Sequence, residues 1–194
     1  MTLQIRHCNQ QDLLKACEER YSLLTQSRTP LDKMRKLAWD AFTSLGFPVH
    51  RAELYRYFPL QRFYAQRWTV RRKEAVQINP EILAPLIHEE SRQSVLIFVD
   101  GCYRKDLSSI SALEGLLTVD PLVQGIRKYR TFLNAYHKKH FAREQDAFAL
   151  MNAALHEEGL FLHLLPNAIC EQPIQILNIL SSESNDEMQM FFSR

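Results

Sequence analysis

The stretch that decides the fold covers residues 148–180 and reads FALMNAALHEEGLFLHLLPNAICEQPIQILNIL. Apolar residues recur at three- and four-residue spacing from Phe148 to Leu155, and this period predicts a helix. Gly159 follows within a turn of the last apolar residue, and we expect it to end the helix in a left-handed conformation. The stretch therefore begins as an amphipathic helix.

Two short apolar runs, residues 160–165 and 174–180, follow the predicted helix. Each contains aromatic or β-branched residues, and each is bounded by turn formers, Pro166-Asn167 after the first run and Pro173 before the second. These features predict two strands. The residues between the runs are too few for a helical crossover, so we expect one helix followed by two strands.

Two helices are predicted near the start of the chain. The first covers residues 9–26, with Asn9 as its N-cap. The second begins with Thr29 as N-cap and Pro30 as the first helical residue, and Gly46 ends it. Both carry apolar stripes at helical spacing, so we expect both to pack on a common core.

A hairpin is predicted near residues 94–104. The apolar run 94–99 has the length of a strand, and Asp100-Gly101 has the preference for positive φ that a two-residue type I′ turn requires. A short helix is predicted to start at Asn79-Pro80, and a longer one to start at Asp120-Pro121 and run towards His137.

The composition is that of a globular protein. The chain has 194 residues and is 46% hydrophobic and 24% charged, enough for one good core or two small ones. No apolar run approaches the roughly 18 residues of a membrane-spanning helix, and the N-terminus lacks a secretory signal. The four cysteines are scattered without a C-x-x-C pair, which suits a reducing compartment, so we expect a cytoplasmic protein without membrane contact. The net charge of +2 does not identify a partner.

Residues 51–73 combine basic and aromatic side chains, with Glu53 the only acid. The basic residues are Arg51, Arg56, Arg62, Arg67, Arg71, Arg72 and Lys73. The aromatic residues are Tyr55, Tyr57, Phe58, Phe63, Tyr64 and Trp68. Single-stranded nucleic-acid binding is one interpretation. We favour the other, in which the rings anchor an irregular segment and the cations stay solvated.

One helical constellation resembles a metal site. His137, His140 and Glu144 are three and seven residues apart and would share a helix face, and imidazoles with a carboxylate bind zinc or iron. The neighbouring cations, which oppose a dication, are Lys138, Lys139 and Arg143. A solvated basic helix is the better interpretation, and we expect no metal and no cofactor.

No catalytic motif stands out either. Ser108, Ser109 and Ser111 lack the Gly-x-Ser-x-Gly context of a nucleophile, and the chain has no glycine-rich phosphate-binding loop. We therefore predict no catalytic residue and no enzymatic activity.

Three segments in collinear order resemble one known family. They are GFPVHRAELYRYFPL (46–60), VLIFVDGCYRKDLSSI (95–110) and the stretch 148–180. Together they resemble the SufD branch of the SufB/SufD family, scaffold subunits of the SUF iron–sulfur cluster assembly machinery. The resemblance implies an α+β fold. We expect a mainly helical N-terminal region over 1–143, with the hairpin, and over 144–194 a helix and the first coil of a right-handed parallel β-helix.

The resemblance also implies a role and partners. We expect a non-enzymatic scaffold subunit that works with SufB-like and SufC-like subunits, the latter an ABC-type ATPase. The chain stops after the first expected coil, so we expect an N-terminal fragment that self-associates through residues 160–192. The family's functional residues lie later in the β-helix, and none is carried over. The alternatives are a small α+β nucleic-acid binder using 51–73 and, third, a metalloenzyme using His137, His140 and Glu144.

Overall fold

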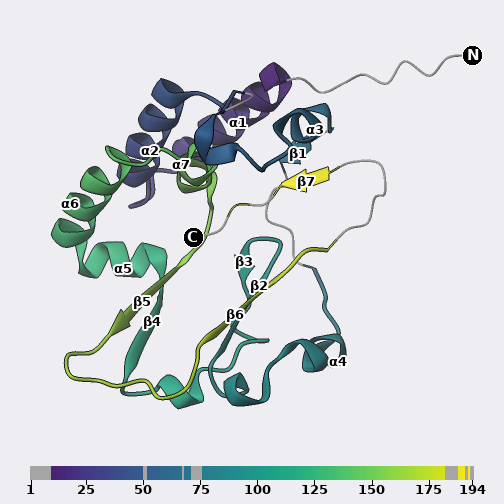
Figure 1. Ribbon diagram of the computed structural model, residues 1–194. Coiled ribbons are helices and arrows are strands. Elements are labelled where there is room, and N and C mark those ends of the chain that lie inside the picture. Colours follow the sequence, from purple (N-terminus) through teal and green to yellow (C-terminus); the bar gives the residue numbers. More distant parts are fainter. Residues whose placement is uncertain are drawn as a thin grey trace, which may run out of the picture. The chain divides into compact units, whose positions relative to one another are not determined.

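The computed structural model describes residues 10–49, 52–66, 68–70, 76–181, 188–190 and 192 (Figure 1). The chain divides into two compact units that interleave along the sequence. Unit 1 comprises Met1–Arg71, Arg130–Leu155 and Ser182–Phe191, and unit 2 comprises Arg72–Tyr129, His156–Ser181 and Phe192–Arg194. The expected boundary near Arg143 stays a prediction. Within the described residues, no helix is long and apolar enough to cross a membrane.

Unit 1 is mainly helical. Its helices are α1 (Gln10–Gln26), α2 (Asp32–Leu45), a 3-10 turn (Glu53–Tyr55), α3 (Leu60–Ala65), α6 (Arg130–Phe141) and α7 (Ala147–Leu155). Two short strands, β1 (Trp68–Val70) and β7 (Met188–Met190), pair in parallel. The helices expected over 9–26, after Thr29 and from Phe148 are thus confirmed, while Asn9 lies outside the described residues.

Helix α7 forms the centre of unit 1. It packs against α2 and α1, and its buried residues are Ala147, Leu150, Met151, Ala153, Ala154 and Leu155. The alanines let the neighbouring helices approach closely. Cys17 of α1 is buried here, with its Sγ 3.6 Å from Sδ of Met151. The thiol is therefore a core side chain, and Cys17 behaves as a small apolar residue, which is common for a free cysteine.

Thr29 is not the N-cap of α2 that the sequence predicted, because Leu31 occupies that position. Asp32 accepts from both the amide of Thr29 at 2.8 Å and its hydroxyl at 2.9 Å. The helix itself begins at Asp32. Gly46 follows its last residue with a φ of 73°, so the predicted end of the helix at Gly46 is confirmed.

Unit 2 contains most of the strands. Its elements are α4 (Pro80–Leu83), β2 (Val95–Val99), β3 (Cys102–Tyr103), β4 (Leu117–Pro121), α5 (Leu122–Lys128), β5 (Leu160–Leu164) and β6 (Gln175–Ile179). Short 3-10 turns lie at Ala84–Leu86, Glu89–Ser91 and Ser111–Leu113. The two strands predicted after α7 are therefore confirmed.

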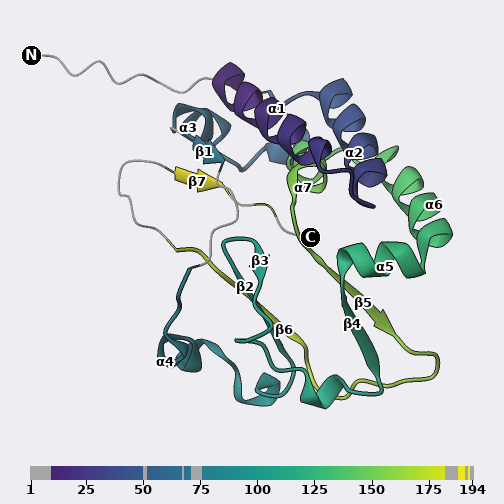
Figure 2. The same ribbon diagram turned by 180° about the vertical axis from the view of Figure 1, so that it is seen from behind.

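Strand β2 is the middle of a three-stranded sheet with the order β3-β2-β6. It forms an antiparallel hairpin with β3, in which Val99 faces Cys102, and Asp100 and Gly101 have φ values of 50° and 79°. The predicted type I′ turn is confirmed. Strand β6 runs parallel to β2 on its other side (Figure 2). One face of this sheet packs on a small core that contains Leu83, Val95, Ile97, Val99, Leu177 and Ile179.

The segment after Leu113 differs from the sequence prediction. Residues 117–121 form β4, which pairs antiparallel with β5, and the helix begins only at Leu122. That helix also stops at Tyr129, where φ is −115° and ψ is 31°, and α6 starts at the next residue. The single long helix towards His137 is therefore wrong: it is two helices, and they belong to different units.

The stop assigned to Gly159 is also wrong. Helix α7 ends at Leu155, and Gly159, which precedes β5, does not have a positive φ. The mixed helix-and-strand class is confirmed. Strands β5 and β6 lie in different sheets, in which β5 pairs antiparallel with β4 and β6 pairs parallel with β2. The coil of a parallel β-helix stays a prediction.

Candidate functional site

Two of the three segments that carry the family resemblance meet in unit 1. Tyr55, from the segment 46–60, donates from its hydroxyl to Oδ1 of Asp146 at 2.6 Å. The same Oδ1 accepts from the amide of Phe148 at 2.9 Å, so Asp146 caps the start of α7. Burial, followed by the hydrogen bond to Asp146, raises the pKa of Tyr55 above its usual range. These residues therefore position the start of a helix and are bonded to one another.

An aromatic cluster surrounds Phe148 in the same unit. The ring of Phe148 lies 5.1 Å from that of Phe63 and 5.5 Å from that of Tyr55, and the rings of Phe47 and Phe58 also contact it. Trp68 packs against Phe63 at 4.5 Å and donates to its carbonyl oxygen. Apart from the exposed Tyr57, the rings of 51–73 thus pack on one another and on α7, which favours the anchoring interpretation over nucleic-acid binding.

Several cations of that segment, Arg51, Arg67, Arg71, Arg72 and Lys73, lie outside the described residues. Arg56 and Arg62 are exposed. The guanidinium of Arg56 lies 5.5 Å from the ring centre of Tyr57, which is 90% exposed. The described part of the segment thus presents a local cation–π pair to solvent.

The second and third family-like segments meet in unit 2. Strand β2 belongs to 95–110 and β6 to 148–180, and they pair over their whole lengths from Val95 opposite Gln175 to Val99 opposite Ile179. At the end of this ladder the carboxylate of Asp100 accepts from the backbone and the hydroxyl of Ser181. The hairpin turn therefore fixes the place where β6 ends.

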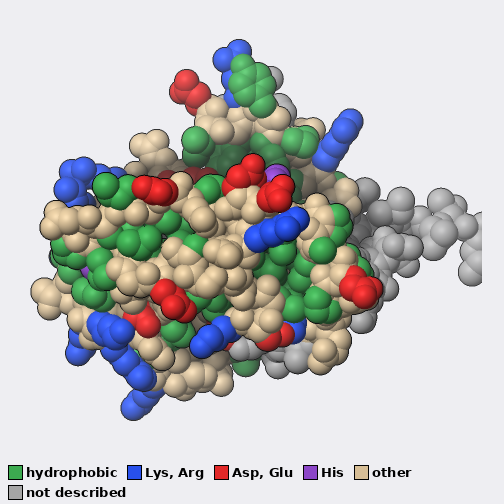
Figure 3. Space-filling model, turned by 90° about the horizontal axis from the view of Figure 1, so that it is seen from below, with side chains coloured by type: hydrophobic (Ala, Val, Ile, Leu, Met, Phe, Trp, Pro, Cys, Tyr) green, Lys and Arg blue, Asp and Glu red, His purple; other side chains and the backbone are tan. Residues whose placement is uncertain are grey.

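Unit 2 exposes apolar side chains along its strands. Leu162 and Leu164 alternate on the outer face of β5, and Ile176 and Leu180, on and after β6, are 54% and 67% exposed. We term these four the exposed strand residues. Within the described part of the chain, β5 pairs only with β4 and β6 only with β2, so each offers an open edge. Figure 3 shows a face of the molecule on which hydrophobic side chains lie between acidic and basic ones.

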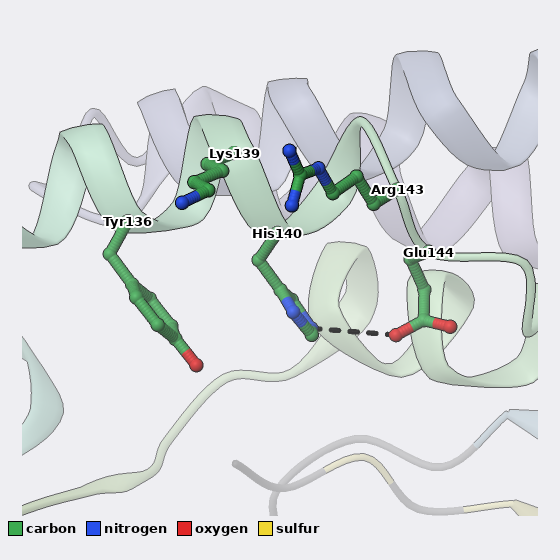
Figure 4. A pocket seen from close by; sticks show the side chains of 5 residues that line it. All are labelled: Tyr136, Lys139, His140, Arg143 and Glu144. Carbon is green, nitrogen blue, oxygen red and sulfur yellow. Dashed lines mark ion pairs between the residues drawn. The ribbon is translucent and has the colours of Figure 1, made fainter.

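A pocket of about 370 Å³ lies beside the end of α6 in unit 1. Its lining residues are Tyr136, Lys139, His140, Arg143 and Glu144 (Figure 4). The rings of Tyr136 and His140 point to the same side of the helix, nearly parallel, with their centres 5.8 Å apart. Nε2 of His140 faces Oε2 of Glu144 at 3.4 Å. We call this the α6 pocket.

The structure brings only part of the expected histidine constellation together. His140 and Glu144 face each other, but His137 is buried and stacks on Phe141, with 5.7 Å between ring centres. The other oxygen of Glu144 accepts from the amides of Gln145 and Asp146 at 2.9 Å. Among the described residues, no cluster of His, Cys, Asp and Glu is placed to hold a metal ion.

Sequence reasoning missed a row of aromatic rings on α6 that includes two residues of the α6 pocket. Phe132, Tyr136 and His140 are four residues apart and form a row of stacked rings, with 6.4 Å between the centres of the first two. Phe132 and Tyr136 are 67% and 53% exposed. The spacing of four residues was visible in the sequence, but it did not indicate which face of the helix meets solvent.

The remaining candidates have structural roles. The hydroxyl of Ser108 accepts from the amide of Ile97 at 2.9 Å and donates to the carbonyl of Arg104 at 2.7 Å, which fixes the segment after the hairpin. Among the cysteines that the structure describes, none forms a disulfide, and burial raises the pKa of Cys17 to about 12. An activated thiolate requires the opposite shift.

Comparison with known proteins identifies a family. The family model described as SufBD protein N-terminal region matches residues 8–176, which include the first two segments discussed above and the third as far as residue 176. A search among curated proteins found no match. The chain therefore belongs to the SufBD protein family, whose N-terminal region it matches.

Proposed function

We propose that this chain acts as a non-enzymatic, SufD-like scaffold subunit in SUF iron–sulfur cluster assembly. The observation that carries the proposal is the family match over residues 8–176. The segments that resemble the family support a structural role. The ring of Tyr55 contacts that of Phe148 in unit 1, and β2 pairs with β6 in unit 2. The residues of the resemblance thus maintain two folded units.

The proposal extends to partners. SufB-like and SufC-like subunits would assemble with the protein, the latter as an ABC-type ATPase, in the reducing cytoplasm. The open edge of β6 and the exposed side chains of Ile176 and Leu180 support an interaction role, since an apolar strand edge is a template for another strand. The parallel pairing of β2 and β6 is the arrangement that a further β-helix coil would continue.

Co-purification tests this proposal. The tagged chain is coexpressed with a SufB-like and a SufC-like subunit, and the recovered partners are quantified. We expect both to be retained by the wild-type chain and lost with the double variant Ile176→Lys and Leu180→Lys. Ile82→Lys is the matched control, because Ile82 is an exposed apolar residue of α4 in the same unit. Recovery of neither subunit with the wild-type chain would exclude the scaffold role.

A further inference from the structure

The surface of α6 has one sign of charge. Residues 130–143 contain basic residues and no Asp or Glu, and the basic ones are Arg130, Lys138, Lys139 and Arg143. Two of these, Lys139 and Arg143, line the α6 pocket one helical turn apart. Neither side chain forms an ion pair with a residue that the structure describes. The pocket therefore offers two cations that no carboxylate of the described residues pairs with.

Glu144, the acid among the lining residues, already has partners for both carboxylate oxygens. Oε1 of Glu144 accepts from two backbone amides, and Oε2 faces the imidazole of His140. Its charge is partly neutralised by these donors, and Figure 4 shows it beside the His140 ring. The local field near Lys139 and Arg143 therefore stays positive, which favours an anion.

The rings of the pocket select among anions. Phe132 precedes Tyr136 by one turn and His140 follows it by one turn, so the two neighbours stack on opposite faces of the Tyr136 ring. The side chains of Phe132 and Tyr136 are 67% and 53% exposed, and the edge of an aromatic ring carries partial positive charge. Bases of single-stranded nucleic acid stack on open ring faces, whereas carboxylates are attracted to ring edges and cations. The arrangement thus matches carboxylates better than bases.

We infer that the α6 pocket, with the exposed ring of Phe132, is a docking site for an acidic segment of a partner protein. Carboxylates of that segment would pair with Lys139 and Arg143, and its apolar atoms would contact Phe132 and Tyr136. The occupant is chosen by charge complementarity, because residues 130–143 carry basic charge alone. This site lies in unit 1, while the exposed strand residues lie in unit 2, so the inference does not depend on the proposed SUF role.

A binding assay with the full chain tests the inference. The probe is a fluorescein-labelled peptide of alternating Glu and Ala, followed by anisotropy at low ionic strength. We expect saturable binding that weakens with added salt. The double variant Lys139→Glu and Arg143→Glu should lose affinity by about tenfold or more, because attraction becomes repulsion at both contacts.

The matched control carries the same charge change at Lys15 and Lys33, which are exposed on α1 and α2 of the same unit. Lys15→Glu with Lys33→Glu should keep most of the peptide affinity. An equal loss in both double variants would show a net-charge effect and overturn the site. No saturable binding by the wild-type chain would also overturn it. A thymidine oligonucleotide of equal charge that binds more tightly than the peptide, and needs Lys139 and Arg143, would assign the pocket to nucleic acid instead.

Discussion

The hydroxyl of Tyr55 donates to Oδ1 of Asp146 at 2.6 Å and accepts from the amide of Ala147 at 2.9 Å. The hydroxyl of Tyr55 thus bonds both the capping carboxylate of Asp146 and the amide of Ala147 in the first turn of α7. Asp146 lies ninety-one residues from Tyr55 in the sequence. Helix α7 is the buried centre of unit 1. The segment 46–60 therefore specifies the place where the most buried helix of the unit begins.

Replacing this phenol tests how much the capping arrangement contributes. Tyr55→Phe keeps the ring contact with Phe148 but leaves the amide of Ala147 without its acceptor. We expect the free energy of unfolding to fall by about 1–3 kcal/mol, the usual cost of an unsatisfied buried donor. Urea denaturation followed by circular dichroism measures it. Tyr57→Phe, at a residue 90% exposed, is the control and should change nothing; equal values for both variants would contradict the role of Tyr55.

The sequence predicted individual helices and turns better than it predicted which strands pair with one another. The helix at 148–155 and the hairpin at Asp100-Gly101 depend on nearby residues, and both appear as expected. Strand β4 was missed because Asp120-Pro121 has the pattern of a helix start, and only its pairing with β5, much later in the chain, makes it a strand.

The break at Tyr129 had no local signal either. No glycine or proline separates α5 from α6 at this point, and the two helices join different units, so packing determines the break. The side chains around the α6 pocket also depend on packing that the sequence does not reveal. Spacing placed His137, His140 and Glu144 on one helix, but burial of His137 and exposure of Phe132 depend on what α6 packs against.

Alkaline solution should destabilise the protein through two partly buried tyrosines, Tyr55 and Tyr64. Burial raises the pKa of Tyr64 from 10.0 to about 12, and burial with the bond to Asp146 raises that of Tyr55. Above pH 10 the unfolded chain releases these protons while the folded chain keeps them, so stability falls as the pH rises towards 12. Urea midpoints across this range should decline less steeply in Tyr55→Phe with Tyr64→Phe. The same decline in Tyr57→Phe as in the wild-type chain provides the control, and an unchanged slope in the double variant would contradict the prediction.

Gly125 should be intolerant of a side chain. A Cβ added there would lie 2.4 Å from Cγ and 2.5 Å from Cβ of Phe161, atoms too close to the backbone of β5 to move freely. We expect Gly125→Ala to lower the free energy of unfolding by about 1–3 kcal/mol, as overpacking does in other cores, despite the higher helix propensity of alanine. Gln124→Ala, at the exposed preceding position of α5, should be neutral or slightly stabilising. A Gly125→Ala protein as stable as wild type would show that α5 and β5 can separate at no cost.

Cys17 should resist thiol reagents in the folded protein. Its side chain is fully buried, and burial raises its pKa to about 12, so almost no thiolate forms at neutral pH. Maleimide labelling resolved by peptide mass spectrometry should modify Cys170, which is only partly buried, before Cys17. In denaturant the two should react at similar rates. Early modification of Cys17 without denaturant would indicate that α1 and α7 open readily.

The exposed strand residues predict that the protein associates with itself. Ile176 on β6 and Leu180 just after it are exposed, and the open edge of β6 has unpaired backbone groups in the described part of the chain. Pairing of two such edges would bury both the backbone groups and the apolar side chains.

We therefore expect a dimer or larger assembly that forms through residues 160–192 and leaves the helices of unit 1 outside the contact. Light scattering over a concentration series should show a mass above 22.8 kDa for the wild-type chain. Ile176→Lys with Leu180→Lys should shift the mass to that of the monomer, because two cations on the edge repel their copies and must stay hydrated. Ile82→Lys, in α4, should leave the assembly intact. A wild-type chain that is monomeric at high micromolar concentration would mean that this edge is not a contact between copies.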